Sequence, residues 1–194
     1  MSRRLEFFFD YVSPYSYLAS SQLPALGERT GAELVYRPFF LGGVMNETGN
    51  RPPATVPSKG AYMLTDLARW AARYGLPFQM NPHFPTNTLL ALRGALVLLA
   101  GEGFVPYHQA MFRAMWSEGA NVGDPAVLGA IVAKLGLDPS AFLARASEPA
   151  QKEALKANTA EAVARGAFGA PTFFVGEQMF FGNDRFAFIE EALR

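Results

Sequence analysis

The alternation of apolar and polar residues divides the chain into two ends with strand character and a helical middle. Near the start, the Phe-rich run 5–10 and the run 33–40 are short and apolar, which is typical of buried strands. Between them, Ser13 followed by Pro14 marks a helix start, and Gly31 marks its end. A strand, a helix and a second strand within about forty residues predict a right-handed crossover onto a parallel pair.

The middle of the chain changes from a loop-like to a helical composition. Residues 41–57 are rich in Gly, Asn and Pro and predict a long loop, which in a compact domain is often functional. From about residue 58 to 165, apolar residues recur every three or four positions, and Gly and Pro mark the segment boundaries. This span is predicted to be helical throughout, and Ser58 is expected to cap its first helix.

The end of the chain returns to strand patterning. Runs 172–175 and 178–181 are separated by Gly176-Glu177, which indicates a hairpin, and a last helix is predicted over 185–193. Unpaired strands would leave backbone N–H and C=O groups without partners. The strands of both chain ends are therefore predicted to share one sheet.

The composition narrows the chemistry that this chain can perform. Its 194 residues are 50% hydrophobic and 18% charged, which supports one compact domain, or one domain with an insertion, around a substantial core. Cysteine is absent. This absence excludes disulfides, thiolate metal sites and a protein-borne thiol nucleophile or Cys-x-x-Cys redox pair.

The charge balance argues against nucleic acid or membrane partners. Lys plus Arg equals Asp plus Glu, 17 against 17, so no net field attracts phosphate groups or an anionic surface. The richest apolar window, 89–100, contains Arg93 and is shorter than the ~20 residues that span a bilayer. The basic start, Met1-Ser2-Arg3-Arg4, precedes an apolar run too short for an export signal, so a cytoplasmic location is expected.

Motifs for nucleotide, metal and hydrolase chemistry are missing. The sequence has no Gly-x-Gly-x-x-Gly or Walker-type loop, no Gly-x-Ser-x-Gly and no Ser-x-x-Lys. His83 and His108 stand in unrelated contexts, and without cysteine no recognisable zinc ligand set remains. Neither a metal nor a nucleotide is expected, and His83 is predicted to lie at the surface or at the edge of a pocket.

Three segments at strand ends remain as candidates for a site, because open α/β sheets place ligands there. In the segment 10–17, Ser13 is either a helix cap or a donor that, with the helix dipole, stabilises an anion. In 166–172, the proline before the strand suits a tight turn, cis or trans, or a plain strand start. In 181–185, Asp184 is either part of a site or a cap of the last helix.

Taken together and in this order, the segments resemble a known family. The stretches that carry the resemblance are Phe9 to Ala19, Gly49 to Pro53, Ser58 to Met63, Phe168 to Thr172 and Phe181 to Arg185. Over essentially its full length, the chain resembles the 2-hydroxychromene-2-carboxylate isomerases and the related kappa-class glutathione transferases, of the DsbA-like thioredoxin superfamily. The resemblance implies an α/β, thioredoxin-like fold (β-α-β … β-β-α) with an all-helical domain inserted between its two halves. Residues 1–57 and 166–194 would form the thioredoxin-like domain, and residues 58–165 the helical insertion.

The resemblance implies glutathione as the missing thiol. In this family, the serine at the position of Ser13 donates a hydrogen bond to the glutathione sulfur, and the residue at Ala170 pairs its backbone with the cysteinyl unit. The stretch 183–185 is similar to the one that holds the γ-glutamyl end. Lys59 is equally well read as a solvated helix residue. The glutathione-binding residues so implied are Ser13, Asn50, Lys59, Ala170, Pro171, Asn183, Asp184 and Arg185.

The activity that the resemblance implies is glutathione-dependent cis/trans isomerisation of a 2-hydroxychromene-2-carboxylate-like aromatic substrate, by reversible thiolate addition. Alternatives are a kappa-class-like glutathione transferase or peroxidase, and a non-catalytic thioredoxin-like binding module. A homodimer is expected by the same resemblance. Composition and loop placement suggest Arg51 or Lys59 for the substrate carboxylate. The same reasoning suggests aromatic residues for contact with the ring of the substrate, although Phe39 and Trp116 are of a kind that more often belongs to a core. The aromatic residues assigned to the substrate pocket are Tyr11, Phe39, Phe84 and Trp116.

Overall fold

The strands of both chain ends form one four-stranded sheet. The protein is described by a computed structural model over residues 3–194, so Met1 and Ser2 of the basic start lie outside the described residues. The sheet order is β2-β1-β3-β4, with β1 parallel to β2 and antiparallel to β3, and with β3 antiparallel to β4. The predicted crossover and hairpin are confirmed. The strands are β1 (Arg4–Phe9), β2 (Glu33–Pro38), β3 (Thr172–Val175) and β4 (Gln178–Phe181).

Helix α1 (Pro14–Thr30) begins and ends where its capping residues predict. The Ser13 hydroxyl accepts the backbone N–H of Ser16 at 3.1 Å, and Pro14 occupies the first turn, where its missing N–H costs nothing. At the other end Gly31 has φ 65°, a left-handed conformation that glycine adopts without strain, and its N–H bonds the Gly27 carbonyl. The crossover helix thus places Ser13 at the end of β1.

Helices form most of the predicted helical middle, but residues 75–88 between α3 and α4 contain no helix, and two other local expectations are wrong. Residues 41–57 are not one loop, because 41–48 form a helix. Val44 from that segment is buried with Phe39, and the Thr159 hydroxyl accepts the N–H of Phe40. Ser58 caps nothing, because the helix already begins at Pro57. The remaining elements are α2 (Leu41–Thr48), the 3₁₀ turn η1 (Pro53–Thr55), α3 (Pro57–Tyr74), α4 (Leu89–Leu98), α5 (Phe104–Trp116), α6 (Pro125–Lys134), α7 (Pro139–Ala146), α8 (Pro149–Ala164) and α9 (Phe186–Ala192).

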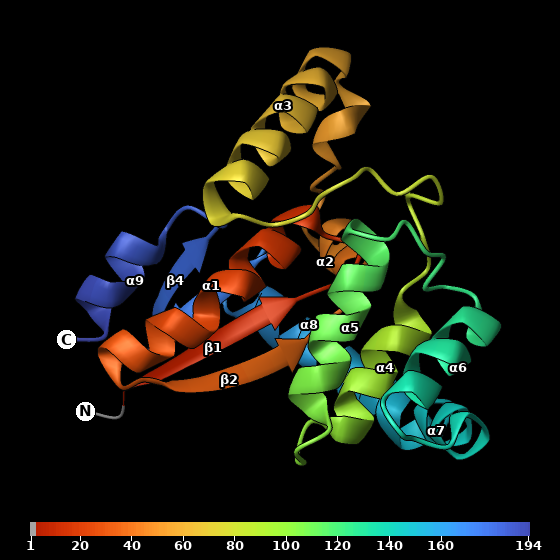
Figure 1. Cartoon of the computed structure of the whole chain (residues 1–194). Helices are drawn as coiled ribbons and strands as arrows, with labels where there is room; N and C mark the ends of the chain where they lie inside the picture. The colour runs from red at the N-terminus through yellow and green to blue at the C-terminus, as the bar shows by residue number, and fades with distance from the viewer. Residues whose placement is uncertain (1–2) are drawn as a thin grey trace.

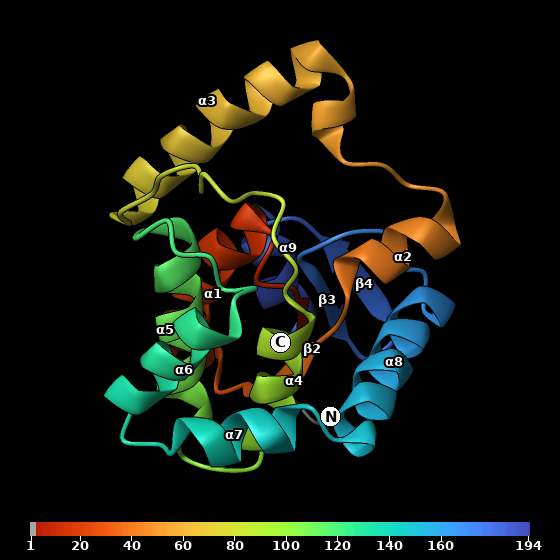
Figure 2. The same ribbon diagram turned by 90° about the vertical axis from the view of Figure 1, so that its right-hand side faces the viewer.

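The Phe-rich strand β1 supplies apolar side chains to both faces of the sheet. Successive strand residues point to opposite faces, so Phe7 and Phe9 belong to one buried cluster and Phe8 to another. The first cluster lies beneath α1 and the helices of the middle segment, and the second lies beneath α2 and α8. Figures 1 and 2 show α1 and α5 on one side of the sheet, with α2 and α8 on the other. The division into a thioredoxin-like domain and a separate insertion domain stays a prediction.

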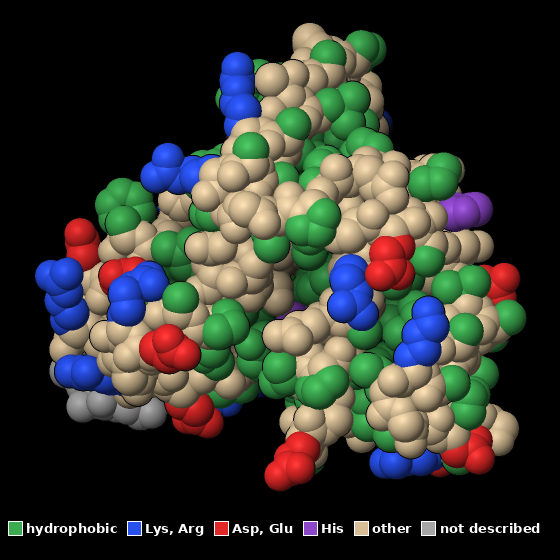
Figure 3. Space-filling model, viewed as in Figure 1, with side chains coloured by type: hydrophobic (Ala, Val, Ile, Leu, Met, Phe, Trp, Pro, Cys, Tyr) green, Lys and Arg blue, Asp and Glu red, His purple; other side chains and the backbone are tan. Residues whose placement is uncertain are grey.

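One part of the helical middle stands away from the body of the molecule. Figures 1 and 2 show η1 and α3 projecting beyond the other elements, and we call residues 53–74 the arm. The carboxyl-terminal half of α3 is tied to α1 through a small buried cluster of Leu18, Leu67 and Ala71. The space-filling view shows hydrophobic side chains along the arm and where it meets the body (Figure 3). Because Ser13 stands at the start of α1, the arm lies close to the end of the helix that Ser13 caps.

The junction of α4, α5 and α7 leaves no room for a side chain at Gly94. A Cβ there would lie 2.5 Å from Cζ of Phe142 and 2.6 Å from the hydroxyl oxygen of Tyr107, both buried residues. Gly94→Ala is expected to lower the free energy of unfolding by about 2 kcal/mol, because overpacking outweighs the better helix propensity of alanine. Urea unfolding measures this change. Gly101→Ala is the matched control, since its nearest neighbour atom is 3.8 Å away. Equal stability of the two variants would contradict the prediction.

Candidate active site

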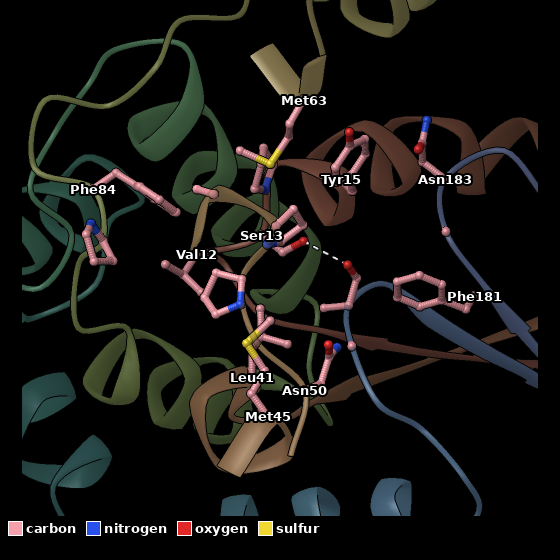
Figure 4. A pocket seen from close by; sticks show the side chains of 18 of the residues that line it. Val12, Ser13, Tyr15, Leu41, Met45, Asn50, Met63, Phe84, Phe181 and Asn183 are labelled. Atoms are coloured by element: carbon pink, nitrogen blue, oxygen red, sulfur yellow. Dashed lines mark hydrogen bonds between the residues drawn. The ribbon is translucent and has the colours of Figure 1, made fainter. Parts of the chain in front are cut away.

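The three segments selected from the sequence meet around one cavity. The cavity has a volume of about 790 Å³, and its lining residues place it at the end of β1, next to the arm. Its walls come from the β1–α1 connection, α2, α3, the segment 76–88, the turn before β3 and the connection from β4 to α9. Segments more than 150 residues apart in the chain thus contribute to one site, with Ser13 in the middle of the close-up (Figure 4).

Ser13 faces the cavity while being almost completely buried. Its exposed fraction is 3%, and its hydroxyl donates to the carbonyl oxygen of Ala170 at 3.1 Å while accepting the N–H of Ser16. The residue also marks the amino end of a 17-residue helix, where the helix dipole favours negative charge. Capping and anion stabilisation, which the sequence left as alternatives, are compatible here because the same hydroxyl both accepts and donates.

The turn before β3 contacts Ser13 directly at the wall of the cavity. The Ala170–Pro171 peptide bond is cis, which answers the question that the sequence left open. Ala170 lines the cavity, whereas Pro171 lies behind it and bonds Gly182 through its carbonyl. The side-chain amide of Asn50 donates to the Phe168 carbonyl at 2.7 Å, so Asn50 closes this wall from the other side. A backbone edge and a neighbouring amide are suited to holding an extended peptide.

The connection from β4 to α9 contributes the most polar wall of the cavity. Asn183 is 97% buried, and its side-chain Nδ2 has no hydrogen-bond partner among residues 3–194. The Tyr74 hydroxyl donates to the backbone carbonyl of Asn183 at 3.0 Å. Asp184 does not cap α9, because it pairs with Arg185 at 2.6 Å and α9 begins without a side-chain cap. A buried amide donor without a partner and an ion pair at the rim provide groups for a zwitterionic ligand.

The opposite end of the cavity is apolar, and of its residues the sequence had assigned only Phe84 to the substrate pocket. In Figure 4, Val12 and Phe84 lie on one side of Ser13, Leu41 and Met45 lie below it, and Met63 lies above it. These residues come from four separate segments, so no sequence motif joins them. Their spacing along the helices is that of ordinary core positions. An apolar wall opposite a polar one is suited to holding an aromatic ring.

Tyr15 and Asp66 join the arm to the first turn of α1 at the edge of the cavity. The Tyr15 hydroxyl donates to Oδ2 of Asp66 at 2.9 Å, and both residues line the cavity. Burial raises the pKa of Tyr15, and the hydrogen bond to Asp66 adds to this effect, so the phenol stays protonated at neutral pH. Sequence reasoning missed this contact because it joins residues that are 51 positions apart.

The remaining predicted site residues divide into three groups. Phe84 and Arg51 line the cavity, and Lys59 lines a smaller adjoining hollow of about 340 Å³ on the arm. The expectation that Tyr11, Phe39 and Trp116 line the substrate pocket is wrong, because all three are completely buried away from it. Their burial has a structural cause: the indole N–H of Trp116 donates to the Tyr11 carbonyl at 2.9 Å, and Phe39 packs on Phe8.

Two further features of the described residues bear on the expected chemistry. Within residues 3–194, acidic and histidine side chains do not gather into a group of three or more that would hold a metal ion. In the same part of the chain, each helix is too short or too polar to cross a membrane. His83 is exposed, as its sequence context predicts, whereas His108 is buried among aromatic rings.

Known proteins are similar to this chain over nearly its whole length. The family profile of the DSBA-like thioredoxin domain matches residues 4–194. A 2-hydroxychromene-2-carboxylate isomerase of Sphingobium xenophagum is 37% identical over 196 residues, covering 100% of this chain and 99% of the relative. Glutathione S-transferase kappa 1 of Caenorhabditis elegans is 32% identical, with 98% of this chain and 91% of the relative aligned. A solved structure of a 2-hydroxychromene-2-carboxylate isomerase, 32% identical, superposes with a TM-score of 0.88 over 98% of this chain and 94% of that one.

These matches confirm the thioredoxin-like α/β fold expected from the sequence. Their coverage leaves no large part of the chain unmatched, and these relatives are named as isomerases and glutathione transferases, which supports an enzyme. The chain belongs to the DsbA-like thioredoxin family, within the group of the 2-hydroxychromene-2-carboxylate isomerases and the kappa-class glutathione transferases.

Proposed function

We propose that the protein is a glutathione-dependent isomerase of a 2-hydroxychromene-2-carboxylate-like aromatic substrate. The observation that carries this proposal is the Ser13 hydroxyl, which is buried at the amino end of α1 in the wall of a cavity large enough for two ligands. Because the chain has no cysteine, the reactive sulfur comes from a bound thiol. On the family resemblance, we propose that the protein acts as a homodimer.

Ser13 is suited to activating a bound thiol. A free thiol has a pKa of ~8.5, and an anion at a helix amino end gains about 0.3 to 1 kcal/mol, or more where it is partly buried. A hydroxyl that donates to the thiolate adds a charge-assisted hydrogen bond. Since about 1.4 kcal/mol corresponds to one pKa unit, the two effects together lower the pKa of the bound thiol toward neutral pH. In doing so the Ser13 hydroxyl turns from the Ala170 carbonyl to the sulfur.

The polar side of the cavity is the proposed glutathione site. The backbone of Ala170, before the cis peptide bond to Pro171, pairs with the cysteinyl unit, and Asn50 lies beside this edge. The buried amide of Asn183 has an unused donor for the γ-glutamyl end, and the Asp184–Arg185 pair lies next to it at the rim. Lys59, in the adjoining hollow, is placed to meet a carboxylate at the outer end of the tripeptide.

The apolar side is the proposed site of the second substrate, and its position beside Ser13 suits reversible addition. After the chromene ring opens, the thiolate forms a C–S bond to the conjugated alkene, and the alkene electrons pass to the carbonyl as an enolate. Rotation about the resulting C–C single bond follows. The enolate then re-forms the alkene and expels the thiolate, so glutathione is unchanged. Val12, Met63 and Phe84 contact the ring, and Arg51, one of the cations that line the cavity, binds the carboxylate.

A second candidate is a kappa-like transferase, in which the glutathione adduct is the final product. The 32% identity to a kappa-class transferase over 98% of this chain favours it. The two candidates share the thiol site and differ in whether the thiolate is expelled.

Turnover of hydroxychromene carboxylate, measured with and without glutathione, tests the proposed function. The expected result is an isomer that forms only when glutathione is present, with no consumption of the thiol. NMR analysis of the product separates this result from a stable glutathione adduct, which would establish the transferase instead. If no turnover occurs and glutathione leaves the melting temperature unchanged, the protein is a binding module or uses another thiol.

A further inference from the structure

We propose that Asp10 is a positioning residue that holds three walls of the cavity in their positions around Ser13. Its catalytic consequence rests on the proposed function, but its structural consequence does not. Asp10 follows β1 directly, is completely buried and does not line the cavity itself. It acts through the groups that it binds.

The carboxylate of Asp10 accepts three hydrogen bonds from three separate segments. Oδ1 accepts the backbone N–H of Val12 at 3.0 Å and the hydroxyl of Thr88 at 2.6 Å. Oδ2 accepts the backbone N–H of Leu41 at 2.9 Å. The Asp10 carbonyl also accepts the N–H of Ser13 at 3.0 Å, so the residue fixes the Ser13 backbone directly.

Each of the three donors belongs to a wall of the cavity. Val12 precedes Ser13, Leu41 is the first residue of α2, and Thr88 ends the segment that contains Phe84. All three donors line the cavity. Figure 4 shows Val12, Leu41 and Phe84 grouped around the apolar side, next to Ser13. One buried carboxylate thus sets the distance between the thiol-activating hydroxyl and the surface that would hold the second substrate.

Because Asp10 is completely buried, losing these hydrogen bonds would leave its carboxyl group without partners at a high cost in free energy. An ionised carboxylate without water needs strong donors, and no lysine or arginine within residues 3–194 forms an ion pair with Asp10. Complete burial raises the pKa of Asp10, and the hydrogen bonds from Thr88, Val12 and Leu41 act against that rise. By contrast, Asp124 is an ordinary cap that accepts one exposed N–H at the start of α6.

Asp10→Asn breaks one bond and leaves the shape of the side chain unchanged. If the amide oxygen keeps the Val12 and Thr88 bonds, the amide nitrogen faces the N–H of Leu41, and two donors oppose each other. Hydrogen exchange measured residue by residue is expected to become at least tenfold faster at the Val12 or Leu41 amide. Asp124→Asn makes the same change at a cap, where asparagine performs as well, and is expected to alter neither amide.

The kinetic test separates positioning from general stability. We expect Asp10→Asn to lower kcat about tenfold while the melting curve stays cooperative, because misplacement of reacting groups by less than 1 Å has effects of this size. Thr88→Val replaces the hydroxyl with a methyl group of similar size and is expected to raise KM for the aromatic substrate several-fold without changing the affinity for glutathione. Thr88→Ser, which retains the hydroxyl, is expected to bring KM back toward the value of the unmodified protein.

The outcomes distinguish this inference from the proposed function. If the unmodified protein shows no glutathione-dependent turnover, the proposed function fails, and the hydrogen-exchange result still decides the structural role of Asp10. If the unmodified protein turns over and Asp10→Asn and Thr88→Val match it in kcat, KM and amide exchange, the positioning role is overturned. If Asp10→Asn does not fold, the contrast between Thr88→Val and Thr88→Ser decides, and equal KM values for these two variants overturn it.

Discussion

Replacing Ser13 by alanine is expected to lower kcat about 10²- to 10³-fold, the effect of removing one donor to a developing anion in a buried site. The hydroxyl is 3% exposed at the amino end of α1, so water does not replace it readily. Glutathione affinity is expected to fall much less, since Asn50, Ala170 and Asn183 bind other parts of the tripeptide in the proposed complex. Steady-state kinetics with varied glutathione separates the two effects.

A control is needed because Ser13 also caps α1. Its hydroxyl accepts the Ser16 N–H, so Ser13→Ala is expected to lower the free energy of unfolding by about 1 kcal/mol. Ser21→Ala removes a hydroxyl from the same helix that bonds only nearby groups and does not line the cavity. This control is expected to keep full turnover. If Ser13→Ala turns over at the rate of the Ser21→Ala control, Ser13 does not activate the thiol.

Ultraviolet absorbance of the thiolate gives a second measure of the same role. In the complex with the unmodified protein, the pKa of the glutathione thiol is expected to lie below the ~8.5 of a free thiol. With Ser13→Ala it is expected to move back toward that value, because one charge-assisted hydrogen bond is gone. A bound thiol with the same pKa in both proteins would speak against activation by Ser13.

Acid is expected to destabilise the protein strongly through His108. This side chain is 2% exposed, and its ring packs against those of Phe9, Phe104 and Phe112. Its Nε2 hydrogen-bonds the Ser20 hydroxyl at 2.8 Å. Burial lowers the pKa of His108 to about 3, so the folded protein holds this ring neutral.

The sign of the pH effect follows from where the proton binds. Below about pH 6.5 the unfolded chain takes up a proton at His108, whereas the folded protein does not until about pH 3. Lowering the pH through this window therefore favours the unfolded state. At about pH 4.5 the loss from this one group is about 2.7 kcal/mol, two pKa units at 1.36 kcal/mol each. Asp10 opposes the effect in part, because burial raises its pKa and the folded state then binds its proton more readily.

Urea unfolding near neutral pH and at about pH 4.5 measures the effect. His108→Phe fits the aromatic surroundings but does not titrate, so its stability is expected to fall by about 2.7 kcal/mol less between the two pH values. His83→Phe makes the same substitution at an exposed position and is expected to keep the pH dependence of the unmodified protein. Identical pH dependence in His108→Phe and the unmodified protein would show that His108 is not the acid-sensitive group.

The local signals in the sequence predicted most of the elements because they act over a few residues. Ser13 with Pro14 and Gly31 set the ends of α1, and Gly176-Glu177 set the β3–β4 hairpin. The prediction of a loop over 41–57 was wrong because a Gly-rich composition is not typical of the helix that part of this segment forms. That helix is stabilised by the burial of Val44 and by the Thr159 hydroxyl, more than 100 residues away.

The candidate site was predictable only where a motif marked it. Ser13 and Ala170 were predicted, and the structure brings them within 3.1 Å of each other. Trp116 and Phe39 were misplaced because aromatic composition does not show whether a side chain faces the core or the cavity. Met45 and Met63 were missed because each occupies an ordinary apolar position in its own helix, and only the tertiary structure brings α2 and α3 to two sides of the cavity around Ser13.

The sequence by itself determined the strand order along the chain, most of the helices, the absence of a protein thiol and the placement of Ser13 at a helix start, since composition and capping are properties of neighbouring residues. The tertiary structure alone decided what Ser13 faces. A cavity wall is assembled from segments far apart in the chain, and their contact depends on long-range packing. The clearest example is Asp10, an ordinary residue after a strand in the sequence. It becomes the common acceptor of Val12, Leu41 and Thr88 only when the distant segments that carry Leu41 and Thr88 fold onto the β1–α1 connection.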